Sequence, residues 1–107
     1  MAHNSFPMKP LQTASGLPVV QNLAVGAASA VATNPVSAQT YAVQLNCTTS
    51  AYVVFAPTSG AAVATATTGF LIKNTDYSMI IGIPAGYYIA AIQVSAAGSL
   101  NILELTH

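Results

Sequence analysis

Residues 40–46 read TYAVQLN and alternate larger apolar side chains with small or polar ones. Tyr41, Val43 and Leu45 fall on one side of an extended chain, and the residues between them fall on the other. This alternation is typical of an antiparallel strand that packs one face on a core and leaves the other to solvent. The stretch therefore predicts a half-buried β-strand near the middle of the chain.

Short runs of the same kind recur on both sides of this stretch. They are separated by turn residues, among them Asn34-Pro35, residues 57–60 (PTSG) and residues 84–86 (PAG). Strands spaced roughly ten residues apart, with no convincing amphipathic helix between them, are typical of all-β domains. We therefore predict an all-β fold, an antiparallel β-sandwich or jelly roll of about eight short strands. The predicted strands cover residues 18–25, 28–33, 40–46, 51–56, 68–73, 77–83, 87–95 and 99–106.

The chain length of 107 residues fits one folded domain. Its first residues differ from the rest, because prolines and a glycine stand among polar side chains there. We predict an extended N-terminal arm over residues 1–16 and a β-sandwich domain over residues 17–107. The arm either frays, as chain ends often do, or becomes ordered on a neighbouring subunit with Phe6, Met8 and Leu11 as anchors.

Two of the predicted strands carry large apolar side chains on both faces. Tyr87 and Ile89 share one side of residues 87–94, and Leu103 and Leu105 share one side of residues 99–106. A two-layer domain covers only one face of each sheet, so the second face needs another partner. A neighbouring chain is the simplest one, and we predict a homo-oligomer, a dimer or trimer. The candidate subunit or capsid interface residues are Phe6, Met8, Leu11, Tyr87, Ile89, Leu103 and Leu105.

Charge is scarce in this sequence. Lys and Arg total 2, Asp and Glu total 2, and charged residues make up 4%, against a usual fraction of about 25%. Because nucleic-acid binding depends on many cations that neutralise phosphates, we expect no nucleic-acid partner. Weak charge repulsion also favours association with other protein. Such a surface is typical of a structural subunit.

Membrane insertion and export are both unsupported by the sequence. The longest uninterrupted apolar run, residues 79–92, is shorter than the roughly 20 residues that span a bilayer, and a predicted turn divides it. The N-terminus lacks the features of a signal peptide. We therefore expect no membrane partner and synthesis in the cytoplasm. Cys47 is the lone cysteine and has no intramolecular disulfide partner.

Residues able to carry acid–base chemistry are few and scattered. Asp76 falls in a predicted turn and Glu104 near the end of the last strand, where we expect it to reach solvent or a partner; His3 and His107 lie at the termini. No nucleophile, base and orienting acid can be assembled from them. We predict no enzyme activity, no catalytic residues, no cofactor and no metal. The five tyrosines, at positions 41, 52, 77, 87 and 88, leave a carbohydrate- or receptor-binding module open as an alternative.

Three stretches of the C-terminal half resemble a known family. They are residues 47–56 (CTTSAYVVFA), 66–72 (ATTGFLI) and 89–106 (IAAIQVSAAGSLNILELT), and they are similar to small virion structural proteins of tailed bacteriophages, of the capsid decoration (cement) type. The segment QVSAAGSL at residues 93–100 is the most specific part of the resemblance. The sequence departs from the family pattern at residues 73–77 and 84–88, where the family's proline-glycine turn and its charged pair are absent.

The resemblance implies a β-sandwich or jelly roll that binds the outside of an assembled capsid and stabilises it. The implied partner is the major capsid protein, and the implied location is the capsid surface of the virion, after synthesis in the host cytoplasm. A head–tail or tail-tip component of the virion is the nearest alternative, because these parts use small β-sandwiches as well.

Overall fold

A computed structural model of the chain describes residues 8–75 and 78–106, and every regular element in this part is a β-strand. The strands of the described chain are β1 (Lys9–Pro10), β2 (Val20–Val25), β3 (Ala30–Val31), β4 (Ala42–Cys47), β5 (Ala51–Ala56), β6 (Phe70–Ile72), β7 (Met79–Gly82), β8 (Tyr88–Gln93) and β9 (Gly98–Thr106). Each of the eight strands predicted from the sequence is present, so the all-β prediction is confirmed. Strand β1 was missed, because two residues that include a proline give no alternation to detect.

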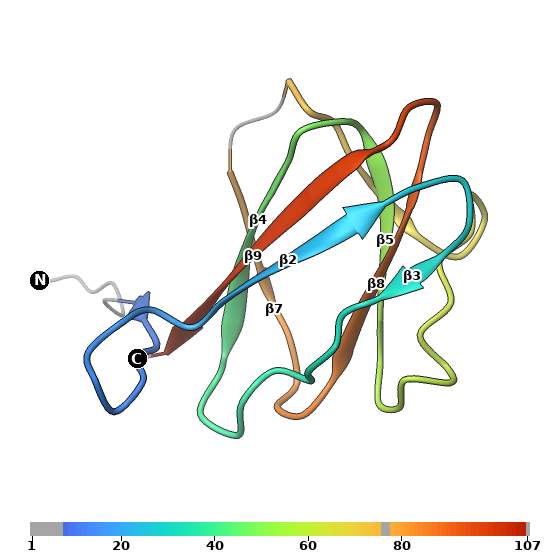
Figure 1. The fold of residues 1–107 in the computed structure, drawn as a ribbon. Coiled ribbons are helices and arrows are strands. Elements are labelled where there is room, and N and C mark those ends of the chain that lie inside the picture. Colours follow the sequence, from blue (N-terminus) through green and yellow to red (C-terminus); the bar gives the residue numbers. More distant parts are fainter. Residues whose placement is uncertain (1–7, 76–77, 107) are drawn as a thin grey trace, which may run out of the picture.

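The strands form two antiparallel sheets that pack on each other (Figure 1). The first sheet has the order β2-β9-β4-β7, and β1 continues the line of β2 along β9. The second sheet has the order β3-β8-β5-β6. The two sheets together make the predicted β-sandwich.

The pairing of the strands is nested. Strand β2 pairs with β9, β3 with β8, β4 with β7 and β5 with β6, all antiparallel. Two further pairings, β4 with β9 and β5 with β8, join these pairs into the two sheets. Strands β2 to β5 therefore run against strands β9 to β6 as one long ribbon that is rolled into a sandwich. This arrangement of eight strands in two sheets is the jelly roll.

The main core lies between the sheets and is aliphatic. Val43 and Leu45 of β4 are fully buried there, as the alternation of residues 40–46 predicted. Tyr41 was expected on the same side but is exposed, because β4 begins at Ala42 and Tyr41 precedes it at the end of the sandwich. The remaining fully buried large aliphatic residues of this core are Val53, Ile72, Ile89, Leu100 and Ile102.

The part of the second sheet's outer face around Ala90 is covered by the chain itself. Ala90 of β8 is completely buried under the connection between β5 and β6, in a small cluster with Ala56, Ala62 and Ala64. The amide of Ala64 donates a 2.8 Å hydrogen bond to the Ser29 hydroxyl, which ties this connection to the chain just before β3. The alanines of this second face therefore have an intramolecular partner, whereas Val31 and Leu71 of the same face are 37% and 42% exposed.

Residues 8–19 are attached to the first sheet. The amide of Leu11 donates to the carbonyl of Glu104 at 2.9 Å, and the amide of Val19 donates to the carbonyl of Leu11 at 2.8 Å. Residues 11–19 loop out between these bonds as a hairpin, visible in blue beside the C-terminus in Figure 1. Gly16 has a φ of 84° in its turn, a conformation that glycine adopts without strain. Residues 9–11 of the predicted arm are therefore paired with β9, residues 12–16 belong to the hairpin, and Phe6 lies outside the described residues.

Candidate functional site

The side-chain carboxyl group of Glu104 helps to hold the fold together. Glu104 is 1% exposed, and its Oε1 accepts a 2.6 Å hydrogen bond from the Thr40 hydroxyl and a 2.9 Å bond from the Ser37 amide. These bonds fix the connection between β3 and β4 to the inner side of β9. We expected Glu104 to reach solvent or a partner; that was wrong, because its side chain points inward with the core-facing residues of β9.

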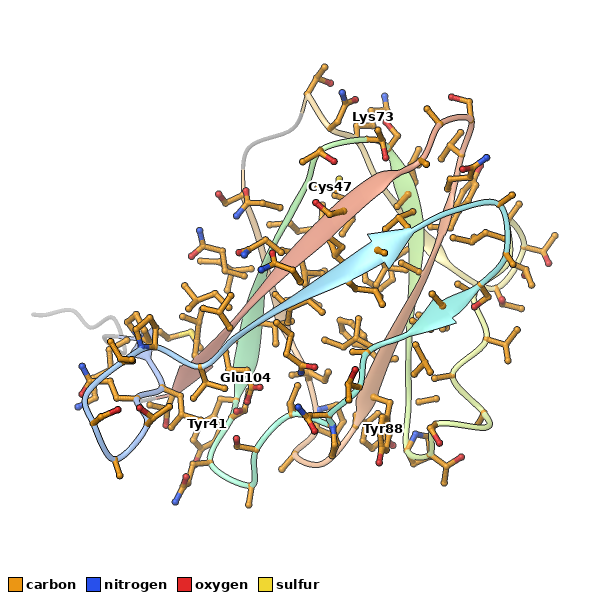
Figure 2. All side chains as sticks on the ribbon, in the orientation of Figure 1. Tyr41, Cys47, Lys73, Tyr88 and Glu104 are labelled. Atoms are coloured by element: carbon orange, nitrogen blue, oxygen red, sulfur yellow. The ribbon has the colours of Figure 1, made fainter. Side chains whose placement is uncertain are left out.

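The other reactive side chains lie far from Glu104. Figure 2 shows Cys47 and Lys73 toward one end of the sandwich and Glu104 with Tyr41 toward the other. The Sγ of Cys47 is half-buried and donates to the carbonyl of Ile72 at 3.6 Å. Asp76, His3 and His107, the remaining acid–base candidates of the sequence, lie outside the described residues. The structure therefore brings no acid–base set together among the residues that it describes.

Ligand-binding architecture is likewise absent from residues 8–75 and 78–106. No pocket opens in this part of the molecule, and no three His, Cys, Asp or Glu side chains gather where they could hold a metal ion. This part also contains no helix long and apolar enough to cross a membrane. Tyr87 and Tyr88 do not form a shared platform, since Tyr87 packs on the main core and Tyr88 on the alanine cluster of the opposite face.

The predicted interface residues occupy different environments. Ile89 and Leu105 are buried within the chain, so they offer little surface to a partner. Tyr87, Leu103 and Leu11 are half-buried, and Met8 is exposed near β1. The assignment by alternation failed for Ile89 because its side of β8 faces the main core. It placed Leu103 correctly on the outer side of β9, away from the core residues Leu100 and Ile102.

The outer face of the first sheet is partly open in the described chain. We call it the uncharged face, because none of the described residues that form it is ionisable. Its members point away from the main core on β2, β9, β4 and β7; they are Val20, Asn22, Ala24, Ala42, Gln44, Asn46, Ile80, Gly82, Ser99, Asn101, Leu103 and Leu105. Ala42 and Leu105 are buried, and the other members are half-buried or exposed.

Strand register arranges this face in rows that cross the sheet. One row is largely apolar: Val20 pairs with Leu103, Leu103 with Gln44, and Gln44 with Ile80. Val20 is 41% exposed and Ile80 57% exposed at the two ends of this row. Aliphatic side chains in such a row lose contact with water only if another surface covers them.

The neighbouring row consists of asparagines. Asn22 pairs with Asn101, and Asn101 pairs with Asn46. The Asn101 Nδ2 donates to the Asn22 Oδ1 at 3.0 Å, and the Ser78 hydroxyl donates to the Asn46 Oδ1 at 2.8 Å. The Nδ2 groups of Asn22 and Asn46 have no partner among the described residues, so they can donate to a bound molecule.

Comparison with protein-family models, with curated proteins and with solved structures found no match to this chain. The uncharged face is therefore understood from its own geometry. Sequence reasoning found its apolar member Leu103 and missed the asparagine row. The alternation of Val20, Asn22 and Ala24 in one strand was a usable signal, but the alignment of Asn22, Asn46 and Asn101 depends on register between strands that are far apart in sequence.

Proposed function

We propose that this chain is a non-enzymatic structural protein of a bacteriophage virion, which decorates the outside of the capsid and stabilises it. The uncharged face carries the proposal, because it is an open sheet surface of alternating apolar and amide rows. Jelly rolls recur in viral capsid proteins, which supports the proposal by analogy of fold. The sequence resemblance to capsid decoration proteins supports it independently.

The two rows supply different parts of the binding energy. The apolar row of Val20, Leu103 and Ile80 gains about 25 cal/mol for each Å² of apolar surface that the capsid protein covers. The amide row sets the orientation in which the capsid protein binds. Amides that become buried must find hydrogen-bond partners, or they cost free energy. A face without charge needs no ion pairs on its partner. It therefore fits a neutral, flat surface of the major capsid protein.

Stabilisation follows from binding the assembled shell in preference to its separate subunits. A shell presents many equivalent sites, so a single contact through the uncharged face can be weak. Many copies on one particle, or several joined in an oligomer, raise the effective concentration at each site. The proposed homo-oligomer of two or three chains would act in this way.

The location of the chain is tested by electron microscopy of purified virus particles that carry it with a label. The proposal expects density over the outer surface of the head. Density confined to the head–tail junction or the tail tip would replace decoration with those alternatives. Absence of the chain from the particles would overturn a virion role altogether.

The role of the uncharged face is tested with a matched pair of lysine substitutions. Val20→Lys changes a 41% exposed residue of this face, and Leu71→Lys changes a 42% exposed residue of β6 in the second sheet. We expect Val20→Lys to weaken co-sedimentation with assembled shells of the major capsid protein by at least about tenfold, because the ammonium group is buried without a partner. Leu71→Lys should bind like the wild type. Equal losses, or none in either variant, would exclude the uncharged face as the docking surface.

The asparagine row favours one second candidate, a carbohydrate-binding module. Amide groups bind sugar hydroxyls, the Nδ2 groups of Asn22 and Asn46 are available, and jelly rolls also occur in lectins. A glycan array discriminates the two functions. Reproducible sugar binding that is lost in Asn46→Ala and retained in Leu71→Lys would favour the carbohydrate function over capsid decoration.

A further inference from the structure

Strand β7 is an edge of the first sheet in the described part of the chain. The amide of Ile83 donates to the carbonyl of Tyr41 at 3.0 Å, so residues 83, 81 and 79 direct their backbone groups toward β4. In an antiparallel pair, the backbone N–H and C=O groups of successive residues point alternately toward the paired strand and away from it. Ile80 and Gly82 therefore direct their N–H and C=O groups away from the sheet, and these groups have no partner among the described residues.

No charge or proline within β7 protects this edge against pairing. Natural edge strands are blocked by charges, prolines, bulges or a covering segment. Residues 79–82 read MIIG, without charge or proline. Ile80 is 57% exposed and Gly82 is exposed as well. Since glycine has no side chain, exposure of Gly82 is exposure of its backbone.

We propose that β7 pairs antiparallel with β7 of a second copy of this chain, which joins the two first sheets into one continuous sheet. A two-fold axis through Ile81 brings Ile80 opposite Gly82 of the other copy at both ends of the contact. The partial positive charge of each N–H then meets the partial negative charge of a C=O, and four backbone hydrogen bonds close. This register uses every outward group of β7, and the symmetry is that of an isologous dimer.

The side chains fit the same register. Ile80 points to the outer side and would lie over Gly82 of the other copy, where no side chain occupies the space. Added atoms at Gly82 would meet only the Tyr41 carbonyl oxygen, at 3.9 Å, so this position is open. Charge does not oppose the contact, because residues 78–84 that the structure describes carry no ionisable side chain.

The contact is small, and this sets the strength of the dimer. A four-residue edge buries less than the roughly 800 Å² per partner of a stable interface, so we expect a dissociation constant of roughly 10 µM to 1 mM. Free protein would exchange between monomer and dimer. The inference does not depend on capsid binding, since it concerns two copies in solution.

Hydrogen exchange of the wild-type protein, followed by NMR across this concentration range, tests the pairing without any substitution. We expect the amides of Ile80 and Gly82 to exchange more slowly as concentration rises. The amide of Ile81, which points toward β4, should not change. Exchange at Ile80 and Gly82 that is independent of concentration would overturn the proposal.

A matched pair of substitutions then tests the backbone bonds. Gly82→Pro removes the outward N–H and no bond to β4, whereas Gly82→Ala keeps the N–H. By sedimentation equilibrium we expect Gly82→Pro to weaken dimerisation roughly thirtyfold, since two hydrogen bonds are lost per dimer. Gly82→Ala should dimerise like the wild type. Dimerisation of Gly82→Pro at wild-type strength would contradict the pairing, whether or not the dimer binds capsids.

Discussion

The outer faces of the two sheets differ in which of their parts the chain itself covers. On the second sheet, Ala90 of β8 lies under the chain's own connection between β5 and β6 and is fully buried. On the first sheet, Val20 and Ile80 stand at the ends of an apolar row that the described chain leaves open. Apolar residues are thus covered internally around Ala90 of the second sheet, whereas Val20 and Ile80 of the first sheet remain available to a partner.

This difference separates residues that stabilise the fold from residues that can bind. The covered face is built of alanines, whose small side chains let the connecting segment approach β8 closely. The open face has larger aliphatic and amide side chains, which suit contact with a separate molecule. Substitutions on the covered face should therefore change stability, and those on the open face should change binding.

The largest effect is expected from a charge placed under the connecting segment. Ala90→Asp buries a carboxylate without a partner and should lower the free energy of unfolding by at least about 3 kcal/mol. The matched variant Ala24→Asp, on the exposed end of the uncharged face, should change it by less than about 0.5 kcal/mol. Urea denaturation measures both. Similar losses in the two variants would show that the two faces do not differ in burial.

The next largest effect is expected on the inner side of the first sheet, where Glu104 binds the connection between β3 and β4. Glu104→Ala leaves the Thr40 hydroxyl and the Ser37 amide without their acceptor, and we expect a loss of about 2–3 kcal/mol. Glu104→Gln keeps an acceptor oxygen and should lose less. Thermal and urea unfolding report the difference. Wild-type stability of Glu104→Ala would mean that the connection before β4 is held by other contacts.

A smaller effect is expected where the connecting segment is tied down. Ser29→Ala removes the acceptor of the Ala64 amide and should cost about 1 kcal/mol. Amide hydrogen exchange at Ala64 should become faster, while exchange in the β4–β9 pair should not change. A uniform increase throughout both sheets would indicate that this bond supports the whole sandwich and not the cover alone.

The smallest effect on stability is expected in the asparagine row. Asn22→Ala removes one exposed hydrogen bond to Asn101 and should change the free energy of unfolding by less than about 0.5 kcal/mol. If the uncharged face binds a capsid or a sugar, the same substitution should weaken that binding. A large loss of stability in Asn22→Ala would instead make the row a structural element of the first sheet.

Much of the secondary structure could be predicted, because its signals are local. Each predicted strand between residues 18 and 106 is present, and the turn at residues 84–86 is closed by Gly86 with a φ of 79°. The candidate site was harder to predict. Alternation placed Leu103 on an outer face correctly, but it could not show that Leu105 is buried or that Ile89 faces the core.

The sequence by itself determined the all-β class, the strand positions and the lack of charge, because side-chain alternation and turn residues act over a few neighbouring positions. Only the tertiary structure decided which strands became neighbours. The nesting of β2 with β9 placed Asn22 beside Asn101, and the connection after β5 covered Ala90. The asparagine pair and the cover over Ala90 both depend on contacts between distant parts of the chain. Such contacts form only when the whole core packs, because the burial of one strand sets its register against the next.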